Sequence, residues 1–364
     1  MQDNKKHNES ALKVNKGVKQ PSIVNPNLTA GAKRRFKKER FTADQYFEGI
    51  RNGDRSFLSR AITLIESTLP DDKETAKALI NKCLPFSGNS FRIGITGVPG
   101  VGKSTFIESF GLSLIEQGKK VAVLAIDPSS SRTQGSILGD KTRMEKLSVT
   151  ANAFIRPSSS AGTLGGVTRN TRESIVLCEA AGFDIILVET VGVGQSETAV
   201  SQMVDFFLLL MLAGGGDELQ GIKRGIMEMA DVIVINKADG DNQQKARLAK
   251  QEYQNALHLF PPSESGWVPS VVTASGLTGN GLEEIQHYLD QFVKLTKNNG
   301  FFDKHRKQQL IAILKETIGD TLATRFYNNK VIREKMKVYE KKILSGNITP
   351  YEAADALLAD YFNL

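Results

Sequence analysis

The stretch FRIGITGVPGVGKSTFIE, Phe91 to Glu108, decides the fold. It starts with an apolar run typical of a buried strand, passes through a glycine-rich turn and ends in a helix-like segment. The turn contains G-x-x-x-x-G-K-S at Gly97, Gly102, Lys103 and Ser104. Glycines let backbone N–H groups surround phosphate oxygens, and the start of the following helix adds partial positive charge. The pattern therefore predicts a phosphate-binding loop at the carboxyl end of a strand.

The residues of this loop have separate expected roles. Lys103 is expected to reach the β- and γ-phosphates of a nucleoside triphosphate, and Ser104 to bind Mg²⁺. The other nucleotide-binding residues expected from the loop are Gly97, Gly100, Val101, Gly102 and Thr105. A strand-to-helix turn without a ligand is one alternative. A dinucleotide-binding loop is another, but it gives no role to the consecutive Lys and Ser.

Strand and helix patterns alternate outward from this loop. Strands are expected at residues 91–96, 121–126, 184–188, 206–212, 232–235 and 268–272, with helices at 103–116, 167–181, 219–229, 243–257 and 282–295. Continuous apolar strands that alternate with helices indicate a parallel sheet covered on both faces. Pro269 cannot donate to a sheet ladder, so we expect it at a strand start or on an edge strand. The fold class predicted is α/β, with a mostly parallel P-loop NTPase sheet flanked by helices.

Both ends of the chain carry helical extensions in this interpretation. Short helices are expected at 43–49, 56–67 and 73–84, and the chain is expected to be helical from Asp303 onward, with breaks near Asn328 and at SGNITP. Thr349 and Pro350 form an N-cap followed by proline at the first helical position. The predicted organisation is a basic leader at 1–40, a helical segment at 41–88, a nucleotide-binding domain at 89–298 and a helical C-terminal region at 299–364.

The net charge of +7 belongs to the leader. Residues 1–40 contain eleven Lys or Arg and three Asp or Glu, a local charge of +8, so the rest of the chain is close to neutral. We therefore expect a solvated, disordered tail rather than a nucleic-acid-binding surface.

Localisation signals are weak in this sequence. The longest apolar run, Phe206 to Ala213, is far shorter than the ~18 residues that span a bilayer. The first residues lack the apolar core of a secretory signal. The two cysteines, Cys83 and Cys178, form neither a disulfide framework nor a Cys-x-x-Cys metal site. We expect a cytoplasmic protein that does not bind membranes.

A second motif, DVIVINKADG, predicts guanine recognition at the end of a strand. The Asp239 carboxylate can accept hydrogen bonds from guanine N1–H and N2–H₂, whereas adenine offers no such pair of donors. Asn236 is expected to support the loop and Lys237 to lie along the base. A plain strand-end turn is the alternative. Ala274 and Ser275, in the segment TAS, are expected to aim a backbone N–H at guanine O6.

Three acidic residues are candidates for the magnesium site together with Ser104. Asp127 follows LAI, Asp140 lies in SILGDKTRM and Glu189 follows DIILV, and oxygen ligands suit Mg²⁺. Asp127 and Asp140 have alternatives as a helix cap and a turn residue. Glu189 ends the strand in ETVGVGQSE, where Gly192 is expected to sense the γ-phosphate.

Several motifs together resemble one family, the methylmalonyl-CoA mutase-associated GTPases of the MeaB/ArgK type. The resemblance runs from about Thr42 to the C-terminus and rests on GVPGVGKST, AIDPSSSRTQGSILGDKTRM, RPSSSAGTLGGVTR, ETVGVGQSE, GGGDELQGIKRG and NKAD. A generic P-loop protein shares only the first and last of these. The resemblance implies a dimerising GTPase that uses GTP or GDP with Mg²⁺ and serves as chaperone to an adenosylcobalamin-dependent acyl-CoA mutase.

The resemblance also implies roles for particular segments. Arg132–Asp140 and Glu189–Gln202 are similar to the first and second nucleotide switches, Gly214–Gly225 to an additional switch that contacts the mutase, and the helices from Asp303 to a dimerisation arm. The catalytic residues expected are Lys103, Glu189, Gln195, Lys223 and Arg143. Val193 replaces the glutamine that often orients the attacking water, so we predict slow intrinsic hydrolysis that a partner accelerates.

Three other functions remain as alternatives. A GTPase that inserts nickel into hydrogenase or urease needs a His/Cys cluster, and none of the four histidines (His7, His258, His287 and His305) adjoins a cysteine in the sequence. A P-loop kinase needs a catalytic base beside an acceptor pocket, and no such motif is evident. A nucleotide-dependent scaffold with little turnover is distinguished by phosphate release in the presence of a mutase.

Overall fold

The computed structural model describes residues 41–126, 144–157, 164–190, 196–214 and 224–363. Residues 42–364 form a compact unit by themselves. The predictions for the leader at 1–40 lie outside the described residues. No helix in the described ranges is long and apolar enough to cross a membrane.

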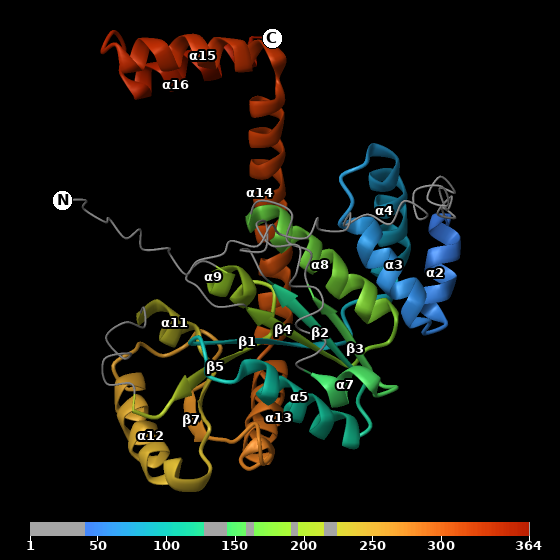
Figure 1. Cartoon of the computed structure of the whole chain (residues 1–364), viewed down its shortest axis with the longest axis vertical. Coiled ribbons are helices and arrows are strands. Elements are labelled where there is room, and N and C mark those ends of the chain that lie inside the picture. Colours follow the sequence, from blue (N-terminus) through green and yellow to red (C-terminus); the bar gives the residue numbers. More distant parts are fainter. Residues whose placement is uncertain (1–40, 127–143, 158–163, 191–195, 215–223, 364) are drawn as a thin grey trace, which may run out of the picture. The chain divides into compact units, whose positions relative to one another are not determined.

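A seven-stranded sheet forms the centre of this unit (Figure 1). Its strand order is β3-β2-β4-β1-β5-β6-β7, and every neighbouring pair is parallel. The strands are β1 (Phe91–Gly97), β2 (Val121–Ile126), β3 (Ala153–Pro157), β4 (Ile185–Thr190), β5 (Phe206–Leu212), β6 (Val232–Asn236) and β7 (Ser270–Thr273). The predicted α/β class with a parallel sheet is confirmed.

The sequence prediction missed β3. This strand has only five residues and includes Arg156 and Pro157, so it lacks the continuous apolar run of the other strands. It pairs with β2 alone and forms one edge of the sheet, where proline is tolerated. Pro269 was expected at a strand start or an edge. It directly precedes β7, which is the opposite edge strand.

Helices cover both faces of the sheet, as its apolar strands require. One face packs against α5 (Lys103–Glu116), α7 (Glu145–Val149) and α13 (Leu282–Asn298), and this layer contains Phe106, Phe110 and Phe292. On the other face, α11 (Arg224–Met229) and α12 (Gln243–Leu257) cover the β5–β7 side. α8 (Leu164–Ala180) and α9 (Ser196–Ser201) contact β2, β4 and β1. Short 3₁₀ turns lie at Leu84–Phe86 and Gly240–Asn242.

The N-terminal helices pack together and against α8. They are α2 (Ala43–Arg51), α3 (Arg55–Ile65) and α4 (Pro70–Cys83). The predicted start of the last helix, residue 73, is wrong by three residues. Pro70 occupies the first helical turn, where a missing N–H is harmless, and Asp71 and Asp72 suit the positive end of the helix dipole.

The C-terminal region is helical, as predicted, and its helices are α14 (Phe301–Asn328), α15 (Lys330–Leu344) and α16 (Pro350–Phe362). The predicted cap at Thr349 is present as a full capping box with Glu352. α15 packs against α16 and the end of α14, and the rings of Phe326 and Tyr361 meet edge to face at 5.2 Å.

Arg306 joins the first turns of α14 to the sheet. Its guanidinium donates to both carboxylate oxygens of Asp205, at 2.8 and 2.7 Å, and to the carbonyls of Gly88 and Ser90. Asp205 directly precedes β5, is almost fully buried, and also accepts the N–H of Arg92 at 2.8 Å. This ion pair fixes α14 at the amino ends of β1 and β5, opposite the edge that carries the phosphate loop.

Candidate nucleotide-binding site

The phosphate loop lies at the carboxyl end of β1, the central strand of the sheet. Gly100 and Gly102 have φ angles of 77° and 89°, which L side chains rarely adopt, so glycine is required for the turn that leads into α5. Gly102 is the N-cap of α5 and provides no side-chain cap, so N–H groups of the first turn remain available to an anion. These features suit a polyphosphate.

Lys103 lies within this loop. Its ammonium donates to the carbonyl of Gly97 at 2.8 Å and contacts that of Val98 at 3.5 Å. Burial lowers the pKa of Lys103, while the carboxylates of Glu189 and Glu197 act in the opposite direction. The two glutamates therefore lie close enough to Lys103 for their charges to matter, although Glu197 is in α9 and Glu189 in β4.

Glu189 is almost completely buried at the end of β4. Its strand lies between β1 and β2, and Glu189 is in register with Ile95 and Ala125. The next residue, Thr190, donates its hydroxyl hydrogen to the hydroxyl of Thr96 at 2.7 Å, and both side chains are buried. A direct side-chain contact therefore links the phosphate-loop strand to the strand that leads into the ETVGVGQSE segment.

The structure brings Ser104 to the first turn of α5 and Glu189 to the adjacent strand end. Oxygen donors of this kind suit Mg²⁺, which usually takes one or two protein ligands in addition to phosphates and waters. Within the described residues there is no group of three or more His, Cys, Asp or Glu that could hold a metal ion. The oxygen donors of Ser104 and Glu189 fit a magnesium ion.

Asn236 connects the base motif to the phosphate loop. Its side-chain N–H donates to the carbonyl of Val101 at 2.8 Å, and its side-chain oxygen accepts the N–H of Gly276 at 3.1 Å. Asn236 is the last residue of β6 and is buried. One amide side chain thus spans two loops that are far apart in the sequence.

Lys237 follows with an unusual backbone conformation. It has a φ of 58°, and within the described ranges it is the single non-glycine residue with positive φ. Such a conformation costs energy and persists where the surrounding contacts impose it. Here the ammonium donates to the carbonyl of Gly100 at 2.8 Å, while the carbonyl of Lys237 accepts from Asn242 at 2.8 Å. These contacts place the lysine ammonium against the phosphate loop.

Ser275 holds the Asp239 side chain in place. The hydroxyl of Ser275 donates a short hydrogen bond to one Asp239 carboxylate oxygen. The same hydroxyl accepts the N–H groups of Leu277 and Thr278, both at 3.2 Å, so Ser275 also shapes the loop that it belongs to.

The backbone N–H groups of Ala274 and Ser275, which were expected to aim at guanine O6, donate to other backbone carbonyls of the chain. The N–H of Ala274 donates to Ile235 and that of Ser275 to Asn280, both at 2.9 Å. The N–H of Gly276 donates to the side chain of Asn236, not to backbone. Ser275 therefore contributes through its side chain, and its backbone N–H is already used within the loop.

Six residues of the predicted site lie outside the described residues. They are Asp127, Asp140, Arg143, Gly192, Gln195 and Lys223. The described part of the site consists of the phosphate loop, Glu189 and the base motif. Sequence reasoning missed the hydrogen-bonded pair Thr96 and Thr190 and the buried Glu197. A polar side chain at the last position of an apolar strand is the signal that could have identified the threonine pair.

The site and the sheet can be compared with known proteins. The family model for methylmalonyl-CoA mutase-associated GTPase MeaB matches residues 58–331, which is most of the chain. The chain belongs to the MeaB family of GTPases. As a MeaB-family member it is a P-loop GTPase, which binds guanine nucleotides and hydrolyses GTP.

Individual relatives of this MeaB-family chain agree with the assignment. A probable GTPase of Mycobacterium tuberculosis is 52% identical over 317 residues, covering 87% of this chain and 94% of the relative. The mouse methylmalonic aciduria type A homolog, a mitochondrial protein, is 47% identical over 332 residues, which cover 88% of this chain and 80% of the relative. A crystal structure of an LAO/AO transport system kinase is 36% identical in sequence and has a TM-score of 0.72. The match covers 88% of this chain and 98% of the chain in that structure.

Proposed function

We propose that this GTPase is a chaperone of an adenosylcobalamin-dependent acyl-CoA mutase, with methylmalonyl-CoA mutase as the first candidate client. In this proposal it gates cofactor loading and protects the mutase from inactivation. The observation that carries the proposal is the family match over residues 58–331, because that family is named for its association with methylmalonyl-CoA mutase. The name of the mouse relative, which refers to methylmalonic aciduria, supports the same client.

The chemistry proposed for the site follows from its described residues. Lys103 and the N–H groups at the start of α5 bind the phosphates, and Asp239 with Ser275 binds the base. Ser104 and Glu189 would hold Mg²⁺, directly or through water, and the ion would supply charge neutralisation at the phosphates. Asp127 and Asp140 complete this set in the proposal, and Gly192 senses the γ-phosphate.

Slow hydrolysis by the isolated protein is part of the proposal. Phosphoryl transfer depends on a positioned water and on neutralisation of charge at the transferring group. Gln195, Lys223 and Arg143 are the candidates for these roles, and each belongs to a segment that the mutase would reorder. GTP turnover would then report that the mutase is bound.

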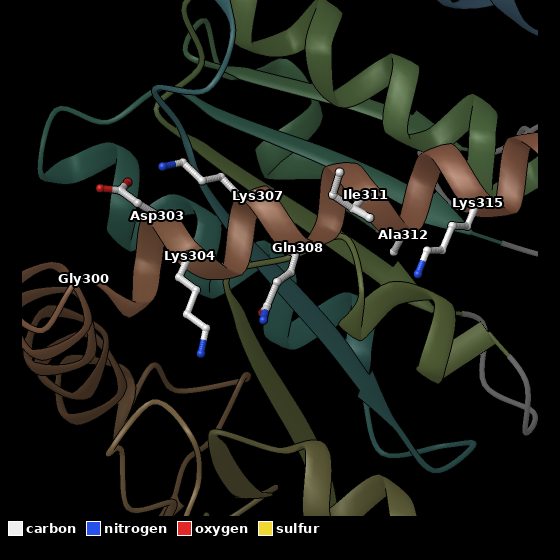
Figure 2. Close-up of a pocket in the computed structure, with 8 residues that line it drawn as sticks. All are labelled: Gly300, Asp303, Lys304, Lys307, Gln308, Ile311, Ala312 and Lys315. Carbon is white, nitrogen blue, oxygen red and sulfur yellow. The ribbon is translucent and has the colours of Figure 1, made fainter.

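A homodimer through the C-terminal helices is also proposed. Ile311, Leu314, Ile318 and Leu322 lie on one side of α14 at helical spacing, and each is about half exposed in the isolated chain. Exposed apolar side chains in such a row are typical of a protein–protein interface. A hollow of about 670 Å³ continues along the same helix from Gly300 to Lys315, where Ile311 and Ala312 lie among lysine side chains (Figure 2).

The mutase is the decisive test of this function. The protein is mixed with an adenosylcobalamin-dependent acyl-CoA mutase from the same source, without nucleotide, with GDP, or with a non-hydrolysable GTP analogue. Complex formation is measured by size-exclusion chromatography, and GTP turnover by phosphate release. We expect a complex in at least one nucleotide state and faster turnover with the mutase. Unchanged hydrolysis together with no complex in any state refutes the proposal.

A matched pair of variants makes this test sharper. Lys223→Ala is expected to remove most of the mutase-dependent acceleration while leaving the slow intrinsic rate unchanged. Lys245→Ala removes an exposed lysine from α12, outside the proposed switches, and should behave like the wild type. If the mutase accelerates GTP hydrolysis equally in both variants, the proposed role of the 214–225 segment in mutase-dependent acceleration is refuted.

A further inference from the structure

Ser109 joins the phosphate-binding helix to the base-recognition loop from a position outside the nucleotide motifs. It lies in the second turn of α5, is half-buried, and donates its hydroxyl hydrogen to the carbonyl of Gly276 at 2.5 Å. Gly276 immediately follows Ser275, the residue that holds Asp239. A hydrogen bond across 167 residues of sequence thus connects the two halves of the site.

Gly276 packs directly on the backbone of α5. A Cβ atom at this position would lie 2.8 Å from the Cα and 2.9 Å from the backbone nitrogen of Phe106, distances that real Cβ contacts do not reach. Phe106 is fully buried in the core, and its N–H donates to the carbonyl of Gly102 at 2.9 Å. The loop therefore rests on a part of the helix that cannot move away without disturbing the phosphate loop.

The Gly276 peptide is held from both sides. Its N–H donates to the side chain of Asn236, which in turn donates to Val101 of the phosphate loop. Its carbonyl accepts only one side-chain hydrogen bond among the described residues, the one from Ser109. Loss of the Ser109 hydroxyl would leave the loop attached through Asn236 and through packing alone.

We propose that Ser109 is a positioning residue for guanine recognition, which clamps the 273–276 loop onto α5 and thereby slows the release of guanine nucleotides. The phosphates are bound by α5 and its preceding loop, whereas the base is bound by Asp239 and the 273–276 loop. A bound nucleotide dissociates only when both sets of contacts have released it, and opening of the base loop is one step of that process. A clamp between the two sets lowers the frequency of opening, and changes to such interactions alter mainly the dissociation rate. The inference rests on the guanine site proposed above.

The test is the dissociation rate of a fluorescent GDP analogue, measured by stopped flow after mixing with excess GDP. Removing one hydrogen bond in Ser109→Ala should accelerate release about five-fold, with the association rate nearly unchanged. Single-turnover hydrolysis at saturating GTP should stay at the wild-type rate, because the clamp does not touch the γ-phosphate. Ser109→Thr keeps a hydroxyl and should restore slow release.

Ser113→Ala is the matched control. Ser113 lies one turn further along α5, is also half-buried, and donates to Phe110 within its own helix while accepting from Gln286 of α13. Its loss removes a hydroxyl from the same helix without touching the base loop, so release should match the wild type. Gly276→Ala disturbs the same contact from the loop side and should accelerate release more than Ser109→Ala.

The outcomes separate this inference from the guanine site itself. If Ser109→Ala and Gly276→Ala fold and release GDP at the wild-type rate, while Asp239→Asn still changes base preference, the clamp is refuted and the site stands. If both variants lower the melting temperature without faster release, Ser109 is merely structural and the inference fails. If the wild type shows no preference for guanine nucleotides, the site proposed above fails first.

Discussion

Replacing Asp239 by Asn tests the base-recognition geometry most directly. In the structure the Ser275 hydroxyl orients the carboxylate, which leaves acceptor capacity for the two N–H groups on one edge of guanine. A hydrogen bond to a charged group contributes about 1.5–3 kcal/mol, so loss of two such bonds to the carboxylate weakens GTP binding by about 10²- to 10⁴-fold. The side-chain amide of Asn keeps the size of Asp but presents a donor where the carboxylate presents an acceptor.

Xanthosine triphosphate provides the complementary measurement, because it has a carbonyl in place of the guanine amine. The affinities of wild type and Asp239→Asn are measured by competition with a fluorescent nucleotide for GTP, xanthosine triphosphate and ATP. We expect the variant to lose GTP affinity and to gain affinity for xanthosine triphosphate, with weak ATP binding in both proteins. Asp241→Asn, at an exposed position two residues on, is the matched control. Unchanged GTP affinity in Asp239→Asn would falsify the assignment.

Three further predictions concern stability and catalysis. Arg306→Met leaves the buried Asp205 carboxylate without its ion pair and should lower the free energy of unfolding, measured by urea denaturation, by about 3–5 kcal/mol. The control Lys307→Met replaces an exposed lysine and should change the free energy of unfolding little. Equal effects of the two variants would show that the ion pair does not fix α14. Burial raises the pKa of Asp231 from 3.8 to about 7, so the unfolded chain releases this proton first and stability falls as pH rises from about 4 to 7. Asp231→Asn should flatten that part of the plot of melting temperature against pH. An unchanged slope would show that Asp231 does not titrate in this range. Glu189→Gln should raise the Mg²⁺ concentration needed for hydrolysis and slow turnover about 10- to 100-fold while GDP binding persists; wild-type Mg²⁺ dependence would remove Glu189 from the metal site.

Most of the sheet was predictable because its strands are buried on both faces. Strands such as Phe206–Leu212 read as unbroken apolar runs, which is typical of strands covered on both faces. β3 could not be found in this way, since an edge strand needs fewer apolar residues and Arg156 and Pro157 interrupt its run. The start of α4 was misplaced for a related reason, because Pro70 and two aspartates resemble a turn but also suit the first turn of a helix.

The sequence predicts candidate site residues wherever one short motif contains the whole chemistry. The phosphate loop is such a motif, since the glycines, Lys103 and Ser104 act through backbone geometry and neighbouring side chains. The base motif was predictable in its residue types but not in its bonding. That the Ser275 hydroxyl orients Asp239, and that the Ser275 N–H is already bonded to Asn280, depends on how two loops meet.

The sequence by itself therefore determined the parallel α/β sheet, and it predicts a phosphate loop at the end of β1 and a guanine motif at the end of β6. Local periodicity and glycine spacing carry that information, because strands, turns and helix starts form over a few residues. Only the tertiary structure decided that Asn236 spans Val101 and Gly276, that Ser109 holds the base loop, and that Arg306 joins α14 to Asp205. These contacts join residues 40 to 167 positions apart, and no local pattern encodes which polar group meets which across the fold.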